Sequence, residues 1–168
     1  MPHNAGQAES GTGVGNIRTP PVLGDEIIWR YGLDYDAFAE HENALLPNYS
    51  TIEGTFFNGE KASDEDGFNF SWESLGVFLN PPYNKGLINK AIEKCILERN
   101  RARIIVALLM ADTSTNYWRH RVVRFAESIQ YLPRVHYWKP DGSGAIIGTP
   151  NFGSAIVVFG RDEWPVNG

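Results

Sequence analysis

The part of this sequence that most constrains its fold lies between residues 77 and 110. Val77-Phe78-Leu79 is a short apolar run that two consecutive prolines, residues 81 and 82, bring to an end. Residues 87–99 follow, with apolar side chains three and four positions apart, which is the pattern of an amphipathic helix. Residues 104–110 are then continuously apolar and β-branched at their start, as in a central strand covered on both faces. This order of strand, helix and strand predicts neighbouring strands of a parallel sheet.

The remaining segments are patterned less strongly. Before residue 77 we expect a short helix after Thr19-Pro20-Pro21, a strand at 33–38, a helix at 40–46, a strand at 48–57 and an acidic loop at 61–66. After residue 110 we expect a helix at 118–127 and strands at 129–132, 135–138 and 155–159. We therefore predict the α/β class, with a mostly parallel sheet and antiparallel carboxy-terminal strands.

Length and composition favour one folded domain at 17–168, since the chain has 168 residues and 42% apolar side chains. The glycine-rich segment 1–16 has no apolar period, so we expect a disordered lead-in. The apolar run at 104–111 is far shorter than the roughly 20 residues of a membrane span. A single cysteine, Cys95, and no zinc-like spacing of Cys and His fit a cytoplasmic protein without a metal site.

The net charge of −5 argues against a protein that coats nucleic acid by charge alone. Contact with DNA would have to be local. The basic residues do cluster, and the two interpretations of these clusters are a phosphate-contacting patch and a solvated helix face. Their members are Arg99, Arg101, Arg103, Arg119, His120, Arg121 and Arg124.

Asn80-Pro81-Pro82-Tyr83 follows the strand at 77–79, where open α/β sheets bind ligands. The side-chain oxygen of Asn80 and the carbonyl of Pro81 are neutral hydrogen-bond acceptors. The prolines restrict the backbone, so these acceptors are oriented before a substrate arrives. Acceptors that hold both hydrogens of a ring amine draw its nitrogen towards tetrahedral geometry and free the lone pair to attack a methyl group. The loop therefore predicts methylation of an amine such as N6 of adenine.

Tyr83 offers an aromatic face for a base turned out of a duplex, and such stacking contributes about 1–3 kcal/mol per base. We expect direct transfer, without a metal or a covalent enzyme intermediate. On the loop residues alone a second interpretation stays open, in which the prolines end a strand and Tyr83 packs as a cap.

The residues around the loop resemble the small phage-type DNA N6-adenine methyltransferase (Dam-like) family over residues 17–159. The resemblance implies a Rossmann-like sheet, S-adenosylmethionine as cofactor and double-stranded DNA as partner. It is carried by Thr19-Pro20, by residues 33–39 with Asn43, by Asp66-Gly67-Phe68 with Trp72, by Asn80-Pro81-Pro82-Tyr83, and further on by residues 108–111, Thr113, Thr115, Trp118, residues 132–134, Pro150 and residues 155–159.

By position, the resemblance assigns Asp36, Phe38 and Ala39 to the strand and turn that hold the methionine part of the cofactor. It places Asp66 and Phe68 beside the cofactor's adenine, where the carboxylate accepts from the amine and the ring packs on the base.

The resemblance also brings Thr19 and Pro20 to the cofactor from the other side. One departure is Glu40-His41-Glu42, which stands where most methyltransferases have a glycine-rich turn. Two alternatives remain: a protein glutamine-N5 methyltransferase, which shares the tetrapeptide but usually has that glycine turn, and a catalytically inactive DNA-binding member of the fold. For a DNA enzyme we expect base readout from loops at 112–117 and 139–151.

Overall fold

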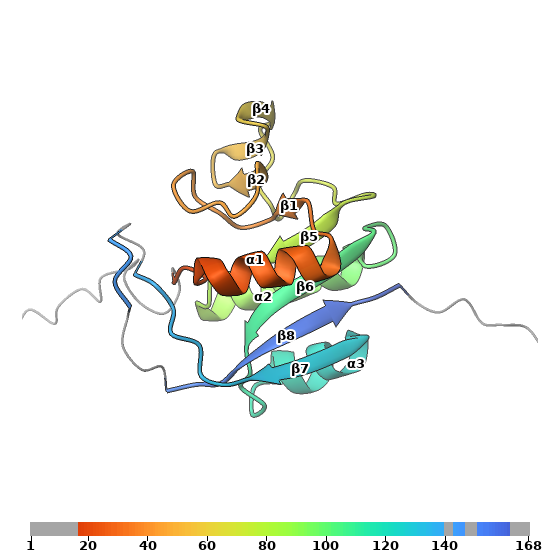
Figure 1. Cartoon of the computed structure of the whole chain (residues 1–168). Coiled ribbons are helices and arrows are strands. Elements are labelled where there is room, and N and C mark those ends of the chain that lie inside the picture. Colours follow the sequence, from red (N-terminus) through yellow and green to blue (C-terminus); the bar gives the residue numbers. More distant parts are fainter. Residues whose placement is uncertain (1–16, 140–142, 147–150, 162–168) are drawn as a thin grey trace, which may run out of the picture.

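The computed structural model describes residues 17–139, 143–146 and 151–161, and the expected lead-in at 1–16 lies outside them. The strands form one sheet in the order β4-β3-β2-β1-β5-β6-β8-β7 (Figure 1). The elements are α1 (Pro21–Tyr31), β1 (Tyr35–Asp36), β2 (Asn48–Thr51), β3 (Gly54–Phe57), β4 (Glu60–Ser63), β5 (Gly76–Leu79), α2 (Lys85–Glu98), β6 (Ile104–Met110), the π-helix η2 (Trp118–Val122), α3 (Val123–Phe125), β7 (Ser128–Leu132) and β8 (Ser154–Phe159).

The centre of the sheet is parallel. β1 pairs in parallel with β2 and β5, and β5 pairs in parallel with β6. β8 is antiparallel to both β6 and β7, which confirms the predicted α/β class and the antiparallel carboxy-terminal strands. At the other edge β2, β3 and β4 form an antiparallel meander, which the sequence analysis did not predict.

Both faces of the central strands are buried, and each face has its own core. On β5, Val77 and Leu79 pack with the apolar stripe of α2, whereas Phe78 points to the opposite core with Ile27 of α1. Figure 1 shows α1 on one side of β5 and β6 and α2 on the other. This two-sided burial explains why β5 and β6 read as uninterrupted apolar runs.

The predicted helix at 87–99 is confirmed as α2. Asn84 caps its amino end by accepting a 3.1 Å hydrogen bond from Leu87 N–H. Its apolar stripe is fully buried at Ala91, Ile92 and Cys95. Because Asn84 caps this helix, the loop at 80–84 is held between the end of β5 and the first turn of α2.

The prediction of a helix at 40–46 is wrong, because this segment forms turns and bends. The N–H groups of Asn43 and Ala44 donate to the Glu40 carbonyl, but two other backbone donors are bound by side chains, so no regular helix continues. Glu40 N–H donates to Asn43 Oδ1 at 2.8 Å, and Leu45 N–H donates to the Asp36 carboxylate at 3.1 Å. The segment thereby stays irregular beside the end of β1.

Three further expectations need correction. Residues 48–57 form two strands, β2 and β3, because Gly54 adopts a φ of 140° after the turn at Ile52. Part of the expected loop at 61–66 belongs to β4. The strand expected at 135–138 is absent from the described residues, where Trp138 makes only isolated bridges to Arg18 and Ile146.

The helix expected at 118–127 is shorter and less regular than its pattern suggested. It consists of the π-helix η2, followed by the short α3, which ends at Phe125. Trp118 and Val122 of η2 are buried in the same core as the apolar stripe of α2.

Gly67 is required where the loop at 66–70 meets the end of β1, since a Cβ there would overlap the carbonyl oxygen of Ala37. We expect Gly67→Ala to lower the free energy of unfolding by about 1–3 kcal/mol, because the backbone must shift to relieve the overlap. Urea unfolding measures the change. Gly86→Ala in α2 is the matched control, because a Cβ there meets nothing within 4 Å. An equal stability of both variants would contradict this packing argument.

Candidate active site

A cleft of about 150 Å³ lies where β1, β2 and β5 end and the loop at 66–68 approaches them. Ligands bind in this position in open α/β sheets, outside the carboxyl ends of the strands. Its lining consists of Ile17, Ala37, Phe38, Ala39, Glu40, Asn43, Ser50, Thr51, Ile52, Asp66, Phe68, Asn80 and Pro82. A side pocket of about 30 Å³ shares Ile17, Phe38, Asn43 and Asn80 with the cleft and adds Arg18, Thr19, Asp36, Leu45 and Phe78.

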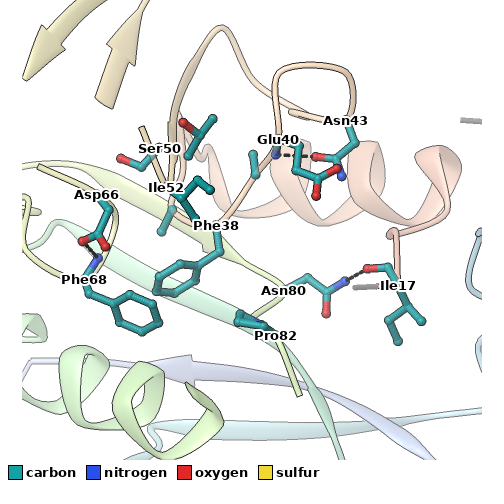
Figure 2. A pocket seen from close by; sticks show the side chains of 13 residues that line it. Ile17, Phe38, Glu40, Asn43, Ser50, Ile52, Asp66, Phe68, Asn80 and Pro82 are labelled. Atoms are coloured by element: carbon teal, nitrogen blue, oxygen red, sulfur yellow. Dashed lines mark hydrogen bonds between the residues drawn. The ribbon is translucent and has the colours of Figure 1, made fainter. Parts of the chain in front are cut away.

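Asn80 lies in the wall of both spaces, and its carboxamide is oriented by hydrogen bonds. Its Nδ2 donates to the Ile17 carbonyl at 3.3 Å and to Thr19 Oγ1 at 3.1 Å, and Figure 2 shows the first of these bonds. The Tyr83 hydroxyl lies 3.0 Å from Asn80 Oδ1. Both amide hydrogens thus have protein acceptors, while a carboxamide oxygen keeps a second lone pair for another donor.

Tyr83 is absent from the lining of the cleft. Its hydroxyl donates to the Leu108 carbonyl of β6 at 2.6 Å, and burial raises its pKa well above the ordinary value, so it stays a protonated donor. Its ring lines a separate cavity of about 510 Å³. The other lining residues of this cavity are Ile88, Asn89, Met110, Asp112, Ser114, Thr115, Asn116 and Tyr117. The loop at 80–83 therefore stands between a cleft and a larger cavity.

Asp66, Phe68 and Phe38 come together at one end of the cleft (Figure 2), although the resemblance assigns Phe38 to the part that holds the methionine. The rings of Phe38 and Phe68 lie 4.5 Å apart between centroids. Among the described residues the hydrogen bonds to the Asp66 carboxylate all end on Oδ1, from the N–H groups of Phe68 and Asn69 at 3.1 Å and from the Asn69 side chain at 2.8 Å. These bonds orient the carboxylate and leave Oδ2 as an acceptor for a ligand.

Asp36 is buried and lies in the side pocket, not in the cleft. Its carboxylate holds the turn at 40–46 through Leu45 N–H, and burial raises its pKa to about 6. Ala39 lines the cleft, and its N–H donates to the Ser50 carbonyl at 2.9 Å. The structure thus places Asp36 in the side pocket next to the cleft.

Of the other expected site residues, two line the cleft or the side pocket and two line neither. Thr19 lines the side pocket, and Pro82 lines the cleft. Pro20 lines neither space and precedes α1, where its carbonyl accepts from Gly24 N–H at 2.9 Å. Pro81 is buried and is absent from both linings.

The sequence analysis missed the contribution of the end of β2. Ser50, Thr51 and Ile52 line the cleft, and Ile52 is 96% exposed at the turn before β3. A strand that ends at Thr51 and pairs in parallel with β1 places these three residues at the cleft. The prediction of one strand over residues 48–57 contains no such end.

The model of the DNA N-6-adenine-methyltransferase (Dam) family matches residues 15–165. The chain belongs to this family. It is accordingly an enzyme that methylates adenine in DNA, and its sheet is consistent with a methyltransferase-like fold. The match is to a family of DNA adenine methyltransferases and not to one of glutamine methyltransferases.

A search of curated proteins finds no match for this chain. In the described part of the chain, no helix is long and apolar enough to cross a membrane. Those same residues contain no group of three or more His, Cys, Asp or Glu that could hold a metal ion.

The buried carboxyl of Asp36 should make folding depend on pH. Because its native pKa of about 6 exceeds the ordinary value of 3.8, the native state binds the proton more tightly, and stability falls as the pH rises from 4 to 6. At about 1.4 kcal/mol per pKa unit, the loss is about 3 kcal/mol. Urea unfolding should show a flatter pH dependence for Asp36→Asn over this window. Parallel pH profiles for the variant and the wild-type protein would contradict the burial argument.

Proposed function

We propose that this family member uses S-adenosylmethionine, bound in the cleft, to methylate N6 of an adenine presented at the Asn80–Tyr83 loop. The observation that supports this most strongly is the orientation of Asn80. Its two amide hydrogens are bound by Ile17 and Thr19, so Oδ1 is the group it offers to an incoming amine.

The cleft has the chemical features that the cofactor requires. Its adenine needs apolar faces and an acceptor for its amine, and Phe38, Phe68 and Asp66 supply these at one end. The exposed side chain of Ile52 adds an apolar surface on the rim. At the other end Glu40 and Asn43 provide polar groups for the amino-acid part (Figure 2). We therefore assign the adenine to the Asp66 end and the methionine part to the Asn80 end.

When bound, S-adenosylmethionine supplies a methyl group on a positively charged sulfur. Asn80 Oδ1 and the Pro81 carbonyl accept the two hydrogens of the target amine, which makes its lone pair available in line with that methyl group. The excess proton leaves to water. The Tyr83 hydroxyl supports this step from behind, because its contacts with Leu108 and Asn80 fix the position of the carboxamide.

The cavity on the other side of the loop is a suitable place for a base turned out of the duplex. It is about 510 Å³ in volume and has the Tyr83 ring in its wall. The loop at 112–117, which we expected to read DNA, lines the same cavity. The second expected reading loop, 139–151, lies largely outside the described residues.

We propose the surface next to this cavity as the docking surface for the DNA backbone. Arg119 and His120 of η2 are exposed there, and His120 lines an adjoining hollow with Asn116. Within this cluster Arg121 is paired with Glu93 at 2.7 Å. In the other cluster Arg103 is paired with Asp34 at 3.2 Å and Arg101 with Glu73 at 3.8 Å. Of the two basic clusters in the sequence, the one on η2 therefore fits DNA better.

Removal of the Asn80 carboxamide tests the mechanism. We expect Asn80→Ala to lose about 10²–10³-fold in turnover, as when one preorganised polar group is removed from an active site, with little change in affinity for S-adenosylmethionine. Incubation with radiolabelled S-adenosylmethionine and duplex DNA, followed by identification of the labelled nucleoside, measures both product and rate. Label on cytosine or on protein, or wild-type turnover in the variant, would contradict the proposal.

Asp66→Asn tests the adenine end of the cleft. Asparagine keeps the Oδ1 acceptor for Phe68 and Asn69 but replaces Oδ2 by a donor, so the loop is preserved while the ligand contact is lost. We expect about tenfold weaker S-adenosylmethionine binding in calorimetry, as for loss of a charge-assisted hydrogen bond. Asp64→Asn, which removes an exposed carboxylate from the same loop, is the control. Equal affinities for both variants would remove Asp66 from the site.

A further inference from the structure

Arg18 is a mostly buried cation whose ion pair within the described residues is long. Its side chain is 14% exposed, and its Nε has no hydrogen-bond partner in the part of the chain that the structure describes. The nearest carboxylate oxygen, on Glu40, lies 3.9 Å from Arg18 Nη2. A charge-assisted hydrogen bond is normally about 2.7–2.9 Å long, so this ion pair is loose.

Other arginines of the chain show the contrast. Arg30 and Arg121 are 42% and 35% exposed, and each lies 2.7 Å from a glutamate oxygen. The Arg18 side chain is less exposed to water than these two, and yet its charge is paired at a longer distance. A buried charge is costly unless it is paired and hydrogen-bonded, so the surroundings of Arg18 are incomplete without an anion.

The backbone fixes Arg18 next to the proposed cofactor cleft. Its N–H and carbonyl each form a 3.0 Å hydrogen bond with Trp138, and its neighbour Thr19 binds Asn80. The Arg18 side chain lines the side pocket, which Asn80 joins to the cleft. Arg18 is therefore held at the Asn80 end, opposite Asp66.

Glu40 stands on the other side of the same space. Its backbone N–H is bound by Asn43, and its side chain lines the cleft and is 54% exposed (Figure 2). A cation and an anion that are near each other, but too far apart to satisfy each other, match the two charges of an α-amino acid group.

We propose that Arg18 binds the carboxylate of the methionine part of S-adenosylmethionine and that Glu40 accepts its ammonium group. The assignment rests on the proposed function, because it requires the cofactor in this cleft. It makes Arg18 a specificity-determining residue, which selects a cofactor that carries a carboxylate. The planar guanidinium suits a carboxylate because it presents two parallel N–H donors.

The test compares two ligands by calorimetry: S-adenosylmethionine and decarboxylated S-adenosylmethionine, which keeps the sulfonium and the amine. The wild-type protein should bind the decarboxylated compound about 10–100-fold more weakly, the size expected for hydrogen bonds to a charged group. Arg18→Gln should lose that factor for S-adenosylmethionine alone, so that its two affinities become similar. Glu40→Gln should weaken both ligands alike, since both carry the amine. Arg30→Gln on α1 is the charge-matched control and should change neither affinity.

Thermal unfolding of each variant without ligand checks its fold. An equal loss of both ligands in a folded Arg18→Gln, or no loss of either, would overturn the assignment. Should that variant not fold, equal binding of the two ligands by the wild-type protein would overturn it as well. Failure of the wild-type protein to bind either ligand would instead remove the proposed cofactor itself, so the two failures are distinguishable.

Discussion

The arrangement of the active site depends on the hydrogen bonds that hold the Asn80 carboxamide. The bonds to Ile17 and Thr19 come from the segment before α1, and the contact with Tyr83 comes from the same loop. Tyr83 is in turn bound to the Leu108 carbonyl of β6. Segments far apart in the sequence thus fix one side chain, and its oxygen has a defined direction before any substrate binds. Such preorganisation is where enzymes gain much of their rate enhancement.

The sheet supplies the rigid frame for this network. β5 and β6 are buried on both faces, so the loops that follow them start from fixed points. The cleft walls that lie further from this centre are supported by local contacts. Asp36 holds the turn at 40–46, and the absence of a side chain at Gly67 lets the Asp66 loop approach Ala37. The loop that we propose to carry the chemistry lies at the end of a central parallel strand.

Sequence reasoning succeeded where a single period or a single motif dominated. The α2 stripe, the apolar β6 and the Asn80–Tyr83 loop were identified, and Phe38, Ala39, Asp66 and Phe68, which we expected to bind a cofactor, line the same cleft as Asn80. It failed where tertiary contacts override local pattern. Residues 40–46 look helical, but the Asp36 carboxylate binds one of their backbone donors. The β2–β3 turn depends on the positive φ of Gly54, which gives no periodic signal, so Ser50 and Thr51 were missed.

The separation of the two spaces around the loop affects how such an enzyme can change in evolution. Within the described residues the linings of the cleft and of the larger cavity have no member in common. Substitutions at Thr115 or Asn116 can therefore alter the surroundings of a base without touching the walls that would hold the methyl donor. Target preference can diverge among relatives while one donor is retained, and variants selected for a new DNA site are best sought on the β6 side of the tetrapeptide.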